Sequence, residues 1–306
     1  MKHISVLLNE TIDSLSIKEN GIYVDCTLGY AGHSSAILKK IKKGYLYAFD
    51  QDNDARSYSE NVLKKIGNNY SIIPSNFVNL KEELLKRGVT KIDGIMFDLG
   101  VSSPQLDDAK RGFSFHQESK LDMRMDKTST LTAYDVVNNY SYDDLRRIIK
   151  DYGDEKYASL IAKTIVEERN KKKIETTLEL SNLITGCVPY KYKRETHPAR
   201  RTFQAIRIEV NKELEVLKKA IEDAIDMLDI NGVISVITFH SKEDKIVKDI
   251  FKNRSKISSM AANLPIVPDE LKPELKVLKK VKPTLEEINN NKRSRSATLR
   301  VAIKMK

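Results

Sequence analysis

Short apolar runs alternate with longer amphipathic stretches through the first third of the chain. Runs rich in β-branched and aromatic residues are typical of buried parallel strands, and stretches with helical periodicity are typical of the helices that cover such strands. The pattern predicts a parallel sheet with helices on its faces. The predicted strands are Ile22–Cys26, Tyr45–Asp50, Tyr70–Ile73 and Ile92–Asp98, and the predicted helices are Ser34–Ile41, Asp54–Ile66 and Phe77–Arg87. We expect Ser34 and Asp54 to be the N-caps of the first two helices.

The alternation stops after Asp98. The stretch from Gly100 to Thr132 contains Pro104, Gly112 and many polar residues, which interrupt regular structure. Helical periodicity then returns without intervening strands, which indicates a helical insertion within the sheet domain. The expected helices of the insertion are Tyr142–Lys150, Glu155–Arg169 and Thr177–Ile184.

An α/β pattern resumes towards the end of the chain. It comprises one long amphipathic stretch, Thr202–Leu228, a strand at Val233–Thr238, a helix at Lys242–Asn253 and a last strand near Thr298–Ile303. Four prolines between Ser255 and Lys292 predict a long loop. We therefore expect a sheet domain made of residues 1–104 and 203–306, interrupted by an inserted helical domain at 105–202.

Length and composition exclude several classes of protein. The 306 residues suffice for about two domains, and a hydrophobic fraction of 40% is too high for a disordered chain. Neither a membrane-spanning apolar run nor the apolar core of a signal peptide is present in the sequence. Cys26 and Cys187 form no C-x-x-C pair and the five histidines lack ligand spacing, so we expect no metal site. These features predict a folded cytoplasmic protein.

The positive charge is concentrated at the end of the chain. The net charge is +10, and residues 271–306 hold eight Lys and three Arg against three Glu. Lys and Arg neutralise phosphates, and the release of counterions favours binding. This segment therefore predicts a nucleic-acid partner, although a solvated basic segment is an equally good explanation of the charge alone.

A glycine-containing turn follows the first predicted strand and leads directly into a helix. Gly29 and Gly32 allow a tight turn and a close approach to a ligand, and the helix start presents free N–H groups. Asp50, at the end of the next strand, is placed to accept hydrogen bonds from ribose hydroxyls. The spacing does not match the G-x-G-x-x-G of dinucleotide sites. Asp25 would repel a pyrophosphate, so the loop favours S-adenosylmethionine.

The fourth predicted strand ends in a second candidate loop. Ligands of open α/β sheets bind beyond the carboxyl ends of the strands, so Asp98 and the residues after it face the same site as Gly29 and Asp50. Methylation of an exocyclic amine needs its lone pair freed from conjugation, which acceptors on the N–H groups assist. Our candidate catalytic residues are Asp98, Ser102 and Pro104.

Several ordered segments resemble the MraW family of bacterial small-subunit ribosomal RNA cytosine N4-methyltransferases. They extend over nearly the whole chain: 3–10, 29–33, 97–107, 111–115, 121–126, 197–199, 201–208, 239–241 and 293–296. The resemblance implies a Rossmann-like S-adenosylmethionine-dependent methyltransferase sheet with an inserted helical domain. It further implies methyl transfer to N4 of a cytidine in the decoding region of 16S ribosomal RNA in the small subunit.

The resemblance also implies site residues. Its cofactor contacts fall on Ala31, Gly32, His33, Asp50, Phe77, Asp98 and Gln105. The family usually has a glycine pair before His33, whereas the first of that pair here is Ala31, whose methyl group is tolerated only if φ stays negative; modestly altered cofactor affinity is the expected consequence of this departure. Cationic and aromatic residues of the insertion suit phosphate contact and stacking of an unpaired base. The candidate RNA-binding residues are Arg111, Arg124, Arg201, Arg207, His240, Arg293 and Arg295.

Other interpretations stay open. Arg111 and Arg124 have Asp107, Asp122 and Asp126 nearby as ion-pair partners, and His240 has a capping role as its alternative. A DNA amine methyltransferase would share the pocket chemistry, but no Asp/Asn-Pro-Pro-Tyr/Phe motif follows the fourth strand. An RNA-binding ribosome assembly factor with a degenerate cofactor pocket and a nicotinamide oxidoreductase are further alternatives. A homodimer is the default expectation for assembly.

Overall fold

The computed structural model describes residues 4–101, 106, 108–193, 197–257, 268 and 271–306, with the side chain of Lys193 excepted. The chain divides into two compact units. The first contains Met1–Gly100 and Leu214–Lys306, and the second contains Val101–Glu213. The insertion thus interrupts one domain that is completed by the two ends of the chain.

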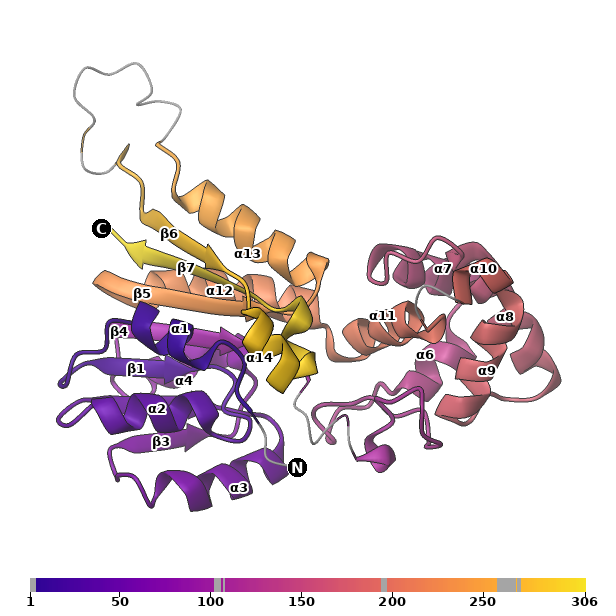
Figure 1. The fold of residues 1–306 in the computed structure, drawn as a ribbon, viewed down its shortest axis with the longest axis horizontal. Helices are drawn as coiled ribbons and strands as arrows, with labels where there is room; N and C mark the ends of the chain where they lie inside the picture. The colour runs from indigo at the N-terminus through magenta and orange to yellow at the C-terminus, as the bar shows by residue number, and fades with distance from the viewer. Residues whose placement is uncertain (1–3, 102–105, 107, 194–196, 258–267, 269–270) are drawn as a thin grey trace. The chain divides into compact units, whose positions relative to one another are not determined.

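The first unit is built on a seven-stranded sheet with the order β3-β2-β1-β4-β5-β7-β6 (Figure 1). Neighbouring strands from β3 to β5 pair in parallel, and β7 and β6 are antiparallel to their neighbours. The carboxyl ends of the parallel strands therefore lie along one edge of the sheet. The strands are β1 (Ile22–Asp25), β2 (Tyr45–Phe49), β3 (Tyr70–Ile73), β4 (Ile92–Asp98), β5 (Leu228–Thr238), β6 (Leu275–Val281) and β7 (Thr298–Lys304).

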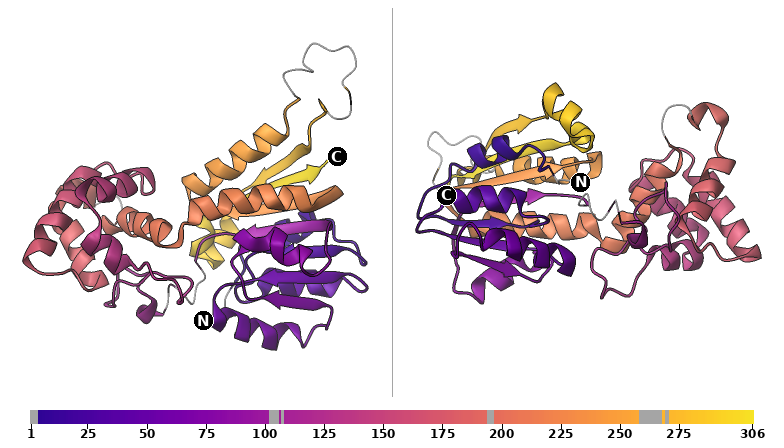
Figure 2. Two further views of the ribbon diagram at one scale, coloured as in Figure 1. Left: turned by 180° about the vertical axis from the view of Figure 1, so that it is seen from behind. Right: turned by 60° about the horizontal axis from the view of Figure 1, so that its bottom comes forward.

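Helices cover both faces of this sheet, because successive strand side chains point to opposite sides. In β4, Ile95 and Phe97 pack into one apolar cluster and Met96 packs into the other. The first cluster includes residues of α4, α12 and α13, and the second includes residues of α1, α2 and α3. Figure 2 shows the unit from two further directions. The helical elements are α1 (Leu8–Ser14), α2 (Gly32–Lys40), α3 (Asn53–Leu63), η1 (Phe77–Asn79), α4 (Leu80–Leu85), α12 (Glu213–Met227), α13 (Ser241–Arg254), α14 (Leu285–Asn290) and η5 (Lys292–Ser296).

The second unit is helical and has a core of its own, which includes Val137, Ile148, Ile161 and Ile206. Thr132 and Thr176 begin their helices with capping boxes, in which side chain and backbone satisfy each other's N–H groups. The elements are η2 (Ala109–Arg111), α6 (Ala133–Asn139), α7 (Tyr142–Asp151), α8 (Ala158–Lys171), α9 (Thr177–Cys187), α10 (Tyr190–Lys193) and α11 (Ala199–Asn211).

The predicted α/β sheet with a helical insertion is confirmed, and several local expectations are wrong. The single stretch Thr202–Leu228 is two helices, because Lys212 adopts a left-handed backbone with φ +50° between α11 and α12. Apolar residues continue at helical spacing on both sides of this break, so the pattern hides it. The boundary between the units lies after Glu213 rather than after 202, because Phe203, Ile206 and Val210 of α11 pack into the core of the insertion.

Capping and loop expectations also differ. Ala31 and Asp52, rather than Ser34 and Asp54, are the N-cap residues of α2 and α3. The region between Ser255 and Lys292 contains β6 and α14 where a long loop was expected, and α1 and α6 were not predicted. Among the described residues, the helices include none that is long and apolar enough to cross a membrane.

Candidate active site

The loop between β1 and α2 forms hydrogen bonds with the ends of the strands on both sides of β1. The backbone N–H of Asp98, at the end of β4, donates to the Thr27 hydroxyl at 2.7 Å. The N–H of Gly29 donates to Asp50 Oδ2, just beyond β2, at 2.9 Å. The loop therefore joins two strand ends at the sheet edge where open α/β sheets bind ligands.

The turn of this loop uses left-handed backbone at Gly29 (φ +49°) and Ala31 (φ +61°). Ala31 therefore does not meet the condition of a negative φ under which its methyl group was expected to be tolerated. The N–H of Ala31 donates to the carbonyl of Leu28 at 2.8 Å, which closes the turn ahead of α2. A side chain in this conformation costs about 1 kcal/mol, a cost that glycine avoids.

Gly32, the first residue of α2, is in contact with the N-terminal segment. A Cβ added at Gly32 would lie 1.7 Å from Ser5 Oγ, so the Ser5 hydroxyl would have to move to admit a side chain there. The segment around Ser5 is held by the opposite end of the chain, because the N–H of Leu7 donates to Glu287 Oε1 of α14 at 2.7 Å. Ser5 and Glu287 were not predicted as contributors to the site.

Asp25 stabilises the loop from inside. Its carboxylate is buried and accepts hydrogen bonds from the Ser34 hydroxyl at 2.7 Å and the Thr27 N–H at 3.0 Å. Burial raises the pKa of Asp25, and these hydrogen bonds partly oppose the rise. The repulsion expected between Asp25 and a bound pyrophosphate is thus weaker than its formal charge suggests, since its acceptors already have donors.

Asp50 receives two backbone hydrogen bonds, one from Gly29 and one from Asp52 N–H at 2.8 Å. Burial nevertheless raises the pKa of Asp50 to about 6. A carboxylate has further lone pairs after accepting two bonds. Asp50 is therefore able to accept hydrogen bonds from a ribose, and this role stays a prediction.

His33 and Asp98 lie next to each other at the carboxyl edge of the sheet. His33 Nδ1 is 3.7 Å from Asp98 Oδ2, and the side chains are 5% and 18% exposed. Burial, reinforced by the charges of Asp25 and Glu243, raises the pKa of Asp98 well above its ordinary value. Within the described part of the chain, the buried Asp98 Oδ1 has no hydrogen-bond partner. An unpaired buried acceptor is costly in an empty site and available to a ligand.

Phe77 begins η1 directly after β3, where Asn76 caps the turn by accepting from the Val78 N–H at 2.9 Å. Its ring packs edge-on against Phe97 of β4, with the centroids 5.6 Å apart. This position fits the expected apolar wall for an adenine and also serves the core. Ser102, Pro104 and Gln105, the remaining residues of the predicted chemistry, lie outside the described residues.

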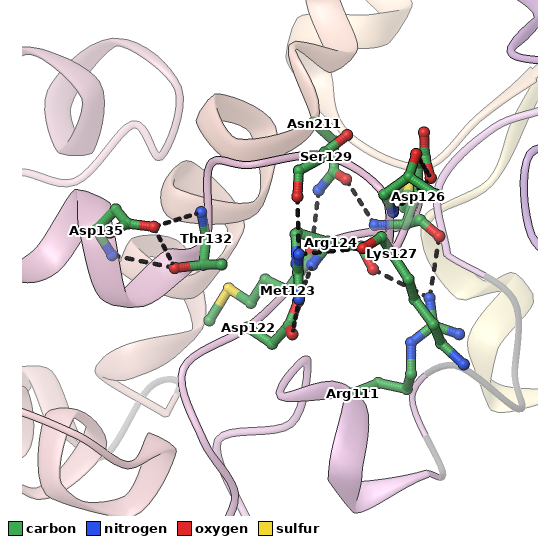
Figure 3. A network of polar contacts seen from close by, with 12 residues as sticks. Arg111, Asp122, Met123, Arg124, Asp126, Lys127, Ser129, Thr132, Asp135 and Asn211 are labelled. Atoms are coloured by element: carbon green, nitrogen blue, oxygen red, sulfur yellow. Dashed lines mark hydrogen bonds and ion pairs between the residues drawn. The ribbon is translucent and has the colours of Figure 1, made fainter.

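Arg111 and Arg124 of the insertion are engaged in internal contacts (Figure 3). Arg111 is buried and donates to the carbonyls of Arg124 and Met125 at 3.0 and 3.1 Å. Arg124 forms a two-point ion pair with Asp122, with both N···O distances 2.8 Å. Ion pairing, the alternative to RNA contact, is what the structure shows for Arg124. Arg111 donates to backbone carbonyls.

The other predicted RNA contacts differ in exposure. Arg207 pairs with both carboxylate oxygens of Glu213 at 2.8 Å, and its side chain is 16% exposed. Arg201 is exposed and donates to the Asp154 carbonyl at 2.6 Å. Arg293 and Arg295, both on η5, are exposed. These last three side chains are the more accessible of the predicted set.

His240 has the capping role that was its alternative. It is the N-cap of α13, where its Nδ1 accepts from the Glu243 N–H at 3.4 Å. Glu243 reciprocates by accepting from the Phe239 N–H at 2.7 Å. The sequence analysis did not identify Thr27, Ser34 or Glu243 as residues that support the site. Thr27 and Ser34 are polar residues that follow the end of a strand, and Glu243 is an acidic residue three positions after a helix cap, so each carries a signal that could have been found.

Comparisons with known proteins identify relatives of this chain. A family model described as the MraW methylase family matches residues 1–305. The chain is 51% identical to the ribosomal RNA small subunit methyltransferase H of Exiguobacterium sibiricum, over 100% of this chain and 99% of that protein. It is also 51% identical to the protein of the same name from Clostridium botulinum strain 657, over 99% of each. An rRNA methylase structure from Streptococcus thermophilus has a TM-score of 0.46 and 11% identity, with 100% of both chains covered. The chain belongs to the MraW methylase family.

Proposed function

We propose that this chain transfers the methyl group of S-adenosylmethionine to N4 of a cytidine in the decoding region of 16S ribosomal RNA. The proposal rests above all on the Asp98–His33 pair at the carboxyl edge of the sheet, beside the loop from Thr27 to Gly32. The named relatives at 51% identity over the full length support the substrate class.

The side chains of the site fit this cofactor. Asp50 offers carboxylate acceptors for ribose hydroxyls, and Phe77 offers an apolar ring beside β4. The buried, unpaired Asp98 Oδ1 suits a positively charged or hydrogen-bond-donating group, because either would relieve the cost of its burial. S-Adenosylmethionine, when bound, supplies a methyl carbon attached to a sulfonium.

Asp98 has two tasks in this mechanism. The first is to bind a positively charged group of the ligand. A positive charge beside Asp98 favours the ionised carboxylate and so lowers the pKa that burial has raised. The carboxylate then accepts a hydrogen bond from the cytosine amino group, which draws the nitrogen lone pair out of conjugation and toward the methyl carbon. The amino group must lose one proton when it is methylated, and the Asp98 carboxylate that accepts its hydrogen bond would take up that proton. His33 Nδ1 lies 3.7 Å from the Asp98 carboxylate, a distance at which a protonated imidazole would form an ion pair with it.

The RNA must present an unstacked base to this site. Arg201, Arg293 and Arg295 are the proposed phosphate contacts, since their side chains are exposed, whereas that of Arg111 is buried and those of Arg124 and Arg207 are half-buried. The protein is further proposed to act in the cytoplasm and as a homodimer. Light scattering on the purified chain tests the dimer, and a monomeric mass would exclude it.

A methyl-transfer assay separates the candidate functions. The purified chain and tritiated S-adenosylmethionine are incubated with small ribosomal subunits that lack the modification, or with duplex DNA. The proposal predicts label in subunit RNA and none in DNA. Label in DNA would favour a DNA amine methyltransferase. A chain that binds small subunits but neither labels their RNA nor binds S-adenosylmethionine would favour a degenerate assembly factor. A chain that binds a nicotinamide dinucleotide would favour an oxidoreductase.

A further inference from the structure

We propose that Phe115, His116 and His197 form a stacking platform for an unpaired RNA base other than the target cytosine. We call this cluster of three rings the aromatic platform. The inference rests on the proposed function only for the class of ligand, because a nucleobase is the planar ligand that an RNA substrate offers. The geometry of the platform lies entirely within the second unit.

The three rings contact one another in a compact group. His197 stacks on Phe115 with a centroid distance of 4.5 Å and an interplanar angle of 26°. His116 lies 4.4 Å from Phe115 and 5.1 Å from His197. His116 is exposed, whereas the other two rings are half-buried. The group therefore reaches solvent through an imidazole.

The platform is anchored to the core of the unit. Phe203 of α11, which is 3% exposed, meets Phe115 edge-on at 5.6 Å. The Ala199 N–H donates to His197 Nδ1 at 3.3 Å, which fixes the imidazole at the start of α11. The N–H of His116 donates to the Ser114 hydroxyl at 3.2 Å. Rings held by packing and hydrogen bonds lose little entropy when a base stacks on them.

A nucleobase fits this surface better than an anionic group alone. Burial and the nearby His116 lower the pKa of His197, which keeps its imidazole neutral at pH 7. A neutral ring interacts through its π-face, and base stacking on aromatic side chains is the usual means of holding single-stranded RNA. The backbone N–H of Arg200 donates to the His197 carbonyl at 3.1 Å. The Arg200 side chain is exposed and provides a cation for the adjoining phosphate.

Another aromatic pair of this unit lacks these properties. Tyr157 and Tyr192 are 5.1 Å apart, but the Lys156 ammonium lies over both rings at 5.1 and 4.7 Å. The Tyr192 hydroxyl also donates to Glu155 at 2.5 Å in the interior. That pair is occupied by its own neighbours, whereas the described residues place no cation over the platform.

The test measures base stacking without catalysis. Single-stranded RNA from the decoding region, carrying 2-aminopurine at one position at a time, is titrated with the full chain in the absence of cofactor. We expect quenched 2-aminopurine fluorescence at one or two positions. His116→Ala should abolish the quenching there and weaken binding about 5- to 150-fold, the range of one stacked base. His116→Phe should restore both signals because it keeps the ring.

A control variant removes an exposed ring elsewhere in the same unit. Tyr142, at the start of α7, is 38% exposed, and Tyr142→Ala should leave quenching and affinity unchanged. Wild-type affinity and quenching in His116→Ala, with an unchanged melting temperature, would overturn the platform. Failure of the proposed function would look different, because the wild-type chain would then not methylate subunits even where quenching is seen.

Discussion

His33 Nδ1 and Asp98 Oδ2 are 3.7 Å apart, and they come from different loops of the same sheet edge. His33 lies in the first turn of α2, and Asp98 is the last residue of β4. The Thr27 hydroxyl accepts from the Asp98 N–H at 2.7 Å and so fixes the second loop against the first. The start of α2 and the end of β4, which are distant in the sequence, therefore contribute side chains to the same site.

The first prediction concerns Asp98. Asp98→Asn removes the carboxylate acceptor and should lower the rate of methyl transfer by about two to three orders of magnitude. Stability should not fall, because an amide at this buried position avoids the cost of an unpaired charge. Single-turnover methylation and thermal unfolding check both parts. Asp25→Asn is the contrast, since Asp25 has three donors from Ser34 and Thr27 and its loss should destabilise the loop.

The second prediction is a pH dependence of cofactor binding. Burial raises the pKa of Asp50 to about 6, so the carboxylate that accepts ribose hydroxyls is ionised above pH 6 and protonated below it. Affinity for S-adenosylmethionine should fall up to about tenfold per pH unit below that value. Calorimetry between pH 5 and 8 measures it.

Unfolding does not explain such a loss. A raised folded-state pKa means that protonation of Asp50 favours the folded chain, so the contribution of this group to stability is full below its unfolded pKa and is lost as pH rises through about 6. Asp50→Asn should bind more weakly and flatten the pH profile between 5 and 7. A wild-type affinity that is constant down to pH 5 would refute the ribose role.

The third prediction uses the Ser5–Gly32 contact. Gly32→Ala places a methyl group 1.7 Å from Ser5 Oγ. This overpacking should lower the free energy of unfolding by about 1–3 kcal/mol and should also weaken cofactor binding. In the double variant Gly32→Ala with Ser5→Ala, the nearest remaining atom would be the Ser5 Cβ at 3.1 Å. The double variant should therefore recover part of the loss, which a thermodynamic cycle measures. Additive effects of the two changes would show that the residues do not touch.

The fourth prediction concerns the left-handed alanine. Ala31→Gly relieves a side chain held at φ +61°, but it also removes a fully buried methyl group and adds flexibility to the unfolded chain, so the free energy of unfolding should change by less than about 1 kcal/mol. Denaturant unfolding provides the value. Cofactor affinity should stay equal or improve. A variant destabilised by about 2 kcal/mol or more would mean that the loop does not hold Ala31 in the left-handed conformation in solution.

The fifth prediction separates structural arginines from RNA contacts. Arg124→Ala breaks the ion pair with Asp122 and the bonds to two loop carbonyls, so it should destabilise the second unit by about 1–3 kcal/mol. Arg293→Ala with Arg295→Ala should reduce the salt dependence of RNA binding by about two phosphate contacts. Filter binding at several salt concentrations distinguishes them. An unaltered salt slope would remove η5 from the RNA interface.

Strand positions were predictable because buried parallel strands form compact apolar runs. The observed β3 and β4 coincide with the predicted ranges, and β1 and β2 end one residue earlier. Strand β6 was missed because Lys276, Lys279 and Lys280 make this edge strand look like a solvated segment. Charged residues on an edge strand protect it from pairing with other chains, so its pattern lacks the usual alternation.

The site was predictable in its residues and not in its contacts. The position of Asp98 at a strand end follows from the sheet pattern, whereas its proximity to His33 depends on the turn geometry of Ala31. The contact of Leu7 with Glu287 joins positions 280 residues apart, and no local pattern indicates it. The internal roles of Arg111 and Arg207 likewise depend on tertiary packing, because a sequence does not show which cations find partners.

Mass spectrometry of nucleosides tests the central claim most directly. Small subunits from a strain that lacks this gene are incubated with the purified chain and methyl-labelled S-adenosylmethionine, and the 16S RNA is digested to nucleosides. The account predicts label in N4-methylcytidine with the wild-type chain and its loss with Asp98→Asn. Label in another nucleoside, or undiminished N4-methylcytidine with Asp98→Asn, would contradict it.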